Sequence, residues 1–316
     1  SYLYDTDNVL FIEKRSLMKR IVLIYFLILA CLFGVLSVLD RGSRYDIEKK
    51  IWKIHKQKLD VTKDPEAVPE RKFENIIGEY RALIRTYPDS ILIPGLYIAI
   101  GDVHALRRDY ERAREVFGEI PELYPDDRDL LAKALFKVGE TYEVSGNWAK
   151  AQEIYQKTIV EYSLTSTALS VPIDSASYDR RKGDSQRMVV AYEKAVERYA
   201  AIAERQENTS VGLGAMRYLA GCYLEQDRWF DAIKILSRIL EVYWTSDHLT
   251  VKEEDQIIKM INRTAAYRLK DYDVAISLYE EIIEDYPGHP LEDYLKKVID
   301  AFNQLKEKNI QVSDGK

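Results

Sequence analysis

Apolar and small residues recur at helical spacing along most of this chain, in pairs of runs separated by short polar breaks. Within residues 132–163, one run ends at Tyr142 and a second begins at Trp148, with a Ser-Gly-Asn break between them. This spacing predicts two amphipathic helices folded back on each other. Gly139 and Ala151 are small where the two helix axes must approach to about 8–10 Å. Because one such pair cannot bury its own apolar face, the pattern predicts neighbouring pairs of the same kind.

The second half of this pattern recurs with a period of about forty residues. Each copy begins with a small or aliphatic residue and has an aromatic residue or leucine four positions later; three copies also have a proline twelve positions later. The copies begin at Ile76, Ala113, Ala151, Ala195, Ala232 and Ala275, and the fourth positions are Tyr80, Phe117, Tyr155, Tyr199, Leu236 and Tyr279. The turn within the pair also recurs, as Asp109-Tyr110, Asn147-Trp148, Arg228-Trp229 and Asp271-Tyr272.

This small–aromatic series with its closing proline resembles the tetratricopeptide repeat (TPR) family over residues 71–290. The resemblance implies an all-α fold, a right-handed superhelical solenoid of helix-turn-helix repeats whose first helices line a concave, protein-binding face. The copies that end in Tyr-Pro-Asp at Pro88 and Pro125 are similar to those of periplasmic long-period TPR proteins of bacterial envelope assembly.

The resemblance also implies which side chains face a partner. These concave-face positions are Ile98, Asp102, Phe136, Glu140, Glu143, Arg217, Leu224 and Arg268. Phe136 and Leu224 would offer apolar anchors, and the acidic positions precede the arginines along the chain. A partner segment with apolar residues and the opposite charge gradient would complement this face.

The remaining segments are less regular. Residues 40–70 are predicted to hold a polar linker and a first helix with Trp52 on its apolar side, and residues 291–316 a capping helix and a polar tail. Leu164–Ser177 is rich in serine and threonine, contains a proline, and is predicted to be a loop.

Ile21–Leu39 is an uncharged apolar run that would span about 28 Å as a helix, close to the roughly 30 Å core of a bilayer. It predicts a transmembrane signal anchor or a cleaved signal peptide, with lipidation at Cys31 the least favoured alternative. The basic residues before the run predict that the leader, residues 1–20, stays in the cytoplasm and that the solenoid is exported to the periplasm of a bacterial envelope. Met18-Lys19-Arg20 followed directly by the apolar run is also typical of a natural signal-sequence start, so residues before Met18 are alternatively non-native.

No catalytic, metal-binding or cofactor-binding motif stands out in the sequence. The four histidines, among them His104, lie far apart, and His104 and Cys222 are expected to be core residues. A net charge of -6 argues against a nucleic-acid partner. We therefore expect no enzyme, cofactor or small-molecule substrate, but a scaffold or adaptor that binds other proteins. The alternative is a structural subunit built permanently into a large enzyme complex or filament.

Overall fold

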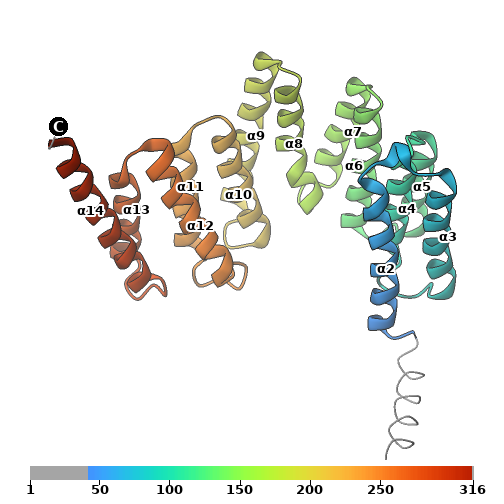
Figure 1. The fold of residues 1–316 in the computed structure, drawn as a ribbon, viewed down its shortest axis with the longest axis horizontal. Coiled ribbons are helices and arrows are strands. Elements are labelled where there is room, and N and C mark those ends of the chain that lie inside the picture. Colours follow the sequence, from blue (N-terminus) through green and yellow to red (C-terminus); the bar gives the residue numbers. More distant parts are fainter. Residues whose placement is uncertain (1–41, 315–316) are drawn as a thin grey trace, which may run out of the picture. The chain divides into compact units, whose positions relative to one another are not determined.

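The computed structural model describes residues 42–314, and every regular element in that span is a helix (Figure 1). The chain divides after Val116 into two compact units, and each is described by itself. The first unit contains α2 (Arg44–Thr62), the short 3₁₀ turn η1 (Pro65–Ala67), α3 (Glu70–Thr86) and α4 (Pro94–Leu106), and the division falls within α5 (Tyr110–Leu123).

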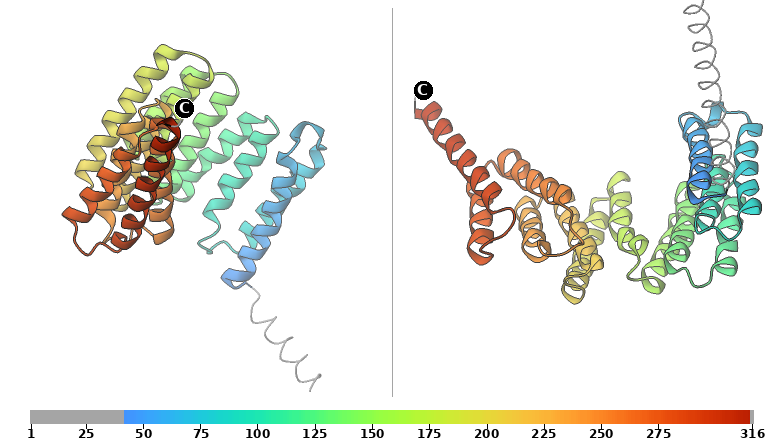
Figure 2. Two further views of the ribbon diagram at one scale, coloured as in Figure 1. Left: turned by 60° about the vertical axis from the view of Figure 1, so that its left-hand side comes forward. Right: turned by 90° about the horizontal axis from the view of Figure 1, so that it is seen from below.

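The second unit continues the same pattern of helix pairs, which follow one another in chain order (Figures 1 and 2). In the pairs, α6 packs on α7, α8 on α9, and α10 on α11, and the last pair is formed by α12 and its π-helical continuation η2 with α13. The elements are α6 (Arg128–Val144), α7 (Trp148–Glu161), α8 (Ser166–Arg181), α9 (Ser185–Arg205), α10 (Ser210–Glu225), α11 (Trp229–Tyr243), α12 (Val251–Arg263), η2 (Thr264–Leu269), α13 (Tyr272–Asp285) and α14 (Glu292–Asp314).

The repeated small and aromatic positions form the core, as the sequence predicts. All six starting residues and all six fourth-position side chains are no more than 4% exposed. A buried tyrosine needs a partner for its hydroxyl group. Four of the fourth-position residues are tyrosines, and each hydroxyl has a hydrogen-bond partner on the preceding first helix. The pairs are Tyr80 with His55 Nδ1 at 3.3 Å, Tyr155 with Glu143 at 2.8 Å, Tyr199 with the Leu169 carbonyl, and Tyr279 with Asn262 at 2.7 Å.

Gly139 shows why a small residue is needed where α6 meets α7. A Cβ atom placed on Gly139 would lie 2.4 Å from Cε1 of the Tyr155 ring. Tyr155 is only 3% exposed and its hydroxyl is hydrogen-bonded, so the ring has no room to move away. The close approach predicted from Gly139 and Ala151 is therefore confirmed.

The turn inside each pair recurs with a left-handed residue, and the sequence pattern did not predict the copy between α8 and α9. One residue adopts a left-handed conformation, and the second helix begins two residues after it. The left-handed residues are Arg108, Gly146, Gly183, Asp227 and Lys270, with φ of 61°, 84°, 75°, 57° and 55°. In the first four turns, the following N–H donates to the carbonyl five residues earlier; in the last, Asp271 N–H reaches back to Ala265 across the wider π turn.

The predicted loop at Leu164–Ser177 is wrong, because this segment forms most of α8. The side chain of Thr165 accepts the Ala168 N–H at 3.2 Å and so starts the helix. Leu169 and Ala176 are then buried against the α9 tyrosines. Serine, threonine and Pro172 disfavour a helix locally, but packing against the neighbouring pair overrides that preference.

Trp52 also differs from its prediction. It is 64% exposed, whereas Ile47, Ile54 and Val61 form the buried side of α2. At the other end, α14 packs on α13 and buries Leu295 and Phe302.

The apolar run Ile21–Leu39 lies outside the described residues. Among the helices between residues 42 and 314, none is sufficiently long and apolar to span a bilayer.

Replacing Gly139 by alanine should destabilise the second unit. Overpacking against Tyr155 costs about 1–3 kcal/mol and the gain in helix propensity returns up to about 1 kcal/mol, so we expect a net loss of about 1–2 kcal/mol in urea unfolding. Gly118 is the matched control, since nothing lies within 4 Å of an added Cβ there. Gly118→Ala should raise stability by about 0.5–1 kcal/mol, and equal effects of the two substitutions would contradict the close approach.

His289 should make the C-terminal repeats sensitive to acid. The ring is 3% exposed, Nδ1 accepts the Leu291 N–H at 3.0 Å, and Nε2 lies 3.4 Å from the Leu240 carbonyl. Burial lowers the pKa of His289 below its ordinary value of 6.5, so the unfolded chain binds the proton more tightly. The free energy of unfolding should therefore fall as the pH drops below 6.5.

Unfolding measured between pH 7 and pH 5 tests this assignment. His289→Gln should make the decline in stability shallower, whereas the exposed His248 replaced by glutamine should leave it unchanged. Parallel curves for the parent and the His289 variant would exclude His289 as the source.

Candidate protein-binding face

The first helices of three repeats form a continuous row, because α8 packs on both α6 and α10. We use the term first-helix face for the surface of this row that carries Phe136, Glu140, Glu143 and Asp174. Helices α7 and α9 belong to the other layer of the pairs. Three of these four residues were predicted from the sequence, and Asp174 was not.

Phe136 and Glu143 both contact the central tyrosine of their repeat. The Phe136 ring is half-buried, with its centroid 5.3 Å from that of Tyr155. Glu143 accepts the Tyr155 hydroxyl at 2.8 Å and a hydrogen bond from Arg181 of α8 at 3.3 Å. Burial, followed by the bond to Glu143, raises the pKa of Tyr155, so the hydroxyl stays protonated and remains a donor.

Asp174 adds a third carboxylate to this face. Its side chain is exposed, but the surrounding protein removes part of its hydration, which raises the pKa of Asp174. Glu140 and Glu143 raise it further, whereas Ser170 and Arg181 act in the opposite direction. Glu140 is paired with Lys137 at 2.7 Å and is still 40% exposed. Glu140 and Glu143 therefore disfavour the charge on Asp174, and a cation beside these carboxylates would relieve that repulsion.

The other predicted face residues lie on other helices. In the first unit, Ile98 is only 4% exposed and therefore belongs to the core. Asp102 of α4 pairs with Lys58 of α2 at 2.8 Å. In the second unit, Leu224 is half-buried, and the exposed Arg268 lies over the Trp229 ring at 4.9 Å from its centroid.

Arg217 connects neighbouring repeats. It donates to Glu253 at 2.9 Å, at the beginning of α12. Glu253 also closes a capping box with Thr250, and the bonds from Thr250, aided by Arg217, lower the pKa of Glu253 to about 2. Arg180 makes a similar link from α8 to Glu225 of α10. Such exposed pairs contribute about 0–1 kcal/mol each, so they adjust the register of the repeats more than their stability.

Two residues expected in the core are there. Cys222 is fully buried, and burial raises the pKa of its thiol to about 12. His104 is 5% exposed; burial lowers its pKa, and its Nδ1 lies 3.8 Å from Asp109 without a hydrogen bond. Within residues 42–314, no three His, Cys, Asp or Glu side chains are placed to share a metal ion.

The tetratricopeptide repeat family matches residues 133–165, 215–243 and 264–289, which correspond to α6 with α7, most of α10 with α11, and η2 with α13. Over these residues the helix pairs are similar to tetratricopeptide repeats. The three matches cover less than half of the chain, and repeats of this kind commonly bind other proteins.

No curated protein sequence matches this chain. Among solved structures, it is similar to the crystal structure of BtubC (BKLC) from P. vanneervenii, with 14% sequence identity and a TM-score of 0.41. That similarity covers 68% of this chain and 88% of the other.

Proposed function

We propose that this protein is a non-catalytic scaffold whose first-helix face holds a segment of another protein. The observation that carries the proposal is the convergence of Glu140, Glu143 and Asp174, from two neighbouring repeats, beside the half-buried Phe136. The complementary segment has a lysine or arginine next to an apolar side chain. Its cation would reduce the repulsion among the carboxylates, and its apolar group would cover the Phe136 ring.

We further propose that the protein is tethered to a membrane of a bacterial envelope. The apolar run Ile21–Leu39 and the basic residues before it support a membrane tether with the repeats in the periplasm of a bacterial envelope. There a right-handed superhelix of repeats would hold subunits of an envelope complex together during assembly.

A double charge reversal tests the face. Glu140→Lys with Asp174→Lys should weaken partner capture at least about tenfold, because each charge-assisted hydrogen bond contributes about 1.5–3 kcal/mol. Partners are identified by crosslinking and mass spectrometry on native membranes, followed by binding of the purified partner to each variant.

Glu280→Lys with Glu281→Lys changes the net charge equally on exposed positions of α13 and should leave capture intact. Unchanged capture by the first-helix variant would refute the proposal. If a partner instead stays bound at fixed stoichiometry in high salt with either charge-reversal variant, the protein is a permanent structural subunit.

A further inference from the structure

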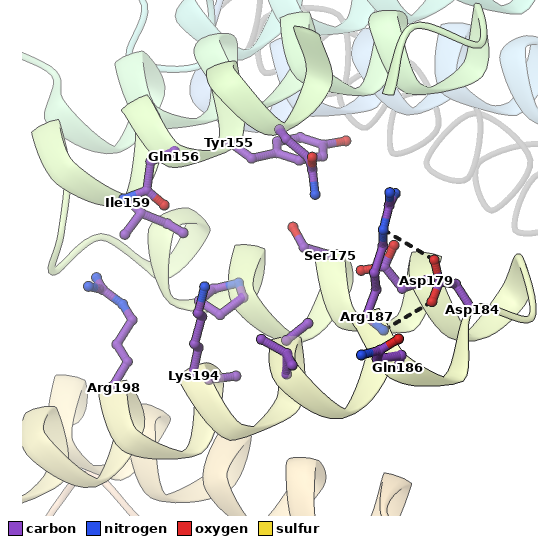
Figure 3. A pocket seen from close by; sticks show the side chains of 15 residues that line it. Tyr155, Gln156, Ile159, Ser175, Asp179, Asp184, Gln186, Arg187, Lys194 and Arg198 are labelled. Carbon is purple, nitrogen blue, oxygen red and sulfur yellow. Dashed lines mark hydrogen bonds and ion pairs between the residues drawn. The ribbon is translucent and has the colours of Figure 1, made fainter. Parts of the chain in front are cut away.

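A cavity of about 870 Å³ lies in the second unit, away from the first-helix face (Figure 3). Its walls are α7 and α9, and α8 contributes Pro172, Ser175 and Asp179. At about 3.6 residues per turn, Pro172 and Asp179 lie about 140–160° around the helix from Asp174, and Ser175 lies about 100° from it. The volume is within the usual range of ligand sites, about 300–1,000 Å³.

One end of the cavity holds a carboxylate that lacks a donor. Asp179 is 5% exposed and forms no hydrogen bond or ion pair through its side chain with any residue between 42 and 314. Burial and the nearby Asp184 raise its pKa. Arg187 acts in the opposite direction and lowers the pKa of Asp179, but its guanidinium forms its ion pair with Asp184, at 3.2 Å. Asp179 also lies in the last turn of α8, where the helix carbonyls add negative potential.

The other end is basic. Figure 3 shows Lys194 and Arg198 side by side on α9, away from Asp179. Arg198 donates to the Ser163 carbonyl at 3.2 Å, but its Nε is buried without a hydrogen-bond partner, and burial lowers its pKa. Lys194 is exposed and forms no ion pair within the described part of the chain. A ligand carboxylate at this end would satisfy both cations.

The walls between the two ends suit a peptide backbone. Gln152 and Gln156 of α7 face the cavity from one side and Gln186 of α9 from the other. Each glutamine amide can donate and accept, as an unpaired peptide group requires. Between them lie apolar contacts, including Val190, which is 45% exposed. A bound helix would satisfy its own backbone, so these amides favour an extended chain.

We propose that this cavity binds an extended segment of a partner protein, with a basic side chain at Asp179 and a carboxylate at Lys194 and Arg198. From Arg187 to Arg198 the groove follows α9 for about 16 Å, at 1.5 Å per residue. An extended peptide rises about 3.3 Å per residue, so about five residues span the site. This site does not depend on the first-helix face, and either can exist without the other.

The test uses the full chain and four fluorescein-labelled, end-capped peptides of the same apolar core. Two carry lysine and glutamate five positions apart, one in each order; the third carries two lysines and the fourth two glutamates. Fluorescence anisotropy should show saturable binding of one mixed peptide, at least about tenfold tighter than either like-charged peptide.

Charge exchange separates recognition from folding. The Lys194→Glu variant should lose the preference for the mixed peptide. It should bind the two-lysine peptide at least about tenfold more tightly than the parent protein does. Lys234→Glu, at an exposed position on α11, should bind like the parent. The variant with Glu140→Lys and Asp174→Lys should also bind normally, which distinguishes this site from the proposed function.

Asp179→Asn provides a second readout. It should weaken binding of the mixed peptide at least about tenfold. The unfolding temperature should stay equal or rise, because the substitution removes a buried charge that has no partner. A lower unfolding temperature would make Asp179 a structural acceptor and overturn the assignment. The proposal would also be overturned if no peptide binds saturably, or if neither Lys194→Glu nor Asp179→Asn changes the binding.

Discussion

The structure depends on one buried position that recurs in each second helix, filled by an aromatic ring in five copies and by Leu236 in the sixth. In the central repeat, the Tyr155 ring occupies the space that a side chain on Gly139 would need. The ring is then fixed by its hydrogen bond to Glu143. The ring thus fills the space beside Gly139 while its hydroxyl is hydrogen-bonded. The two helices cannot slide past each other without losing both the packing and the hydrogen bond.

The same contact connects the two surfaces of the central repeat. Tyr155 lines the cavity between α7 and α9, and its hydroxyl reaches Glu143 on the first-helix face. Each surface is therefore built on a side chain held rigidly by the core. Rigid support of this kind lowers the entropic cost of ordering side chains when a partner binds.

The polar groups of α8 show a departure from optimal stability. Asp174 lies exposed among like charges, and Asp179 is buried without a donor. A helix selected only for stability would carry neutral residues at both positions. Unfavourable charges on opposite sides of one helix are consistent with two surfaces that each gain from a partner.

The sequence by itself determined the helix pairs, their period and the buried small–aromatic series, because these follow from helical spacing and side-chain size along the chain. Only the tertiary structure decided that α8 is a helix, since its serine and threonine residues become helical through packing against α9. It also decided that Ile98 is buried and that Asp174 joins Glu140 and Glu143. Exposure and charge proximity are properties of neighbouring repeats, and a periodic pattern within one repeat does not contain them.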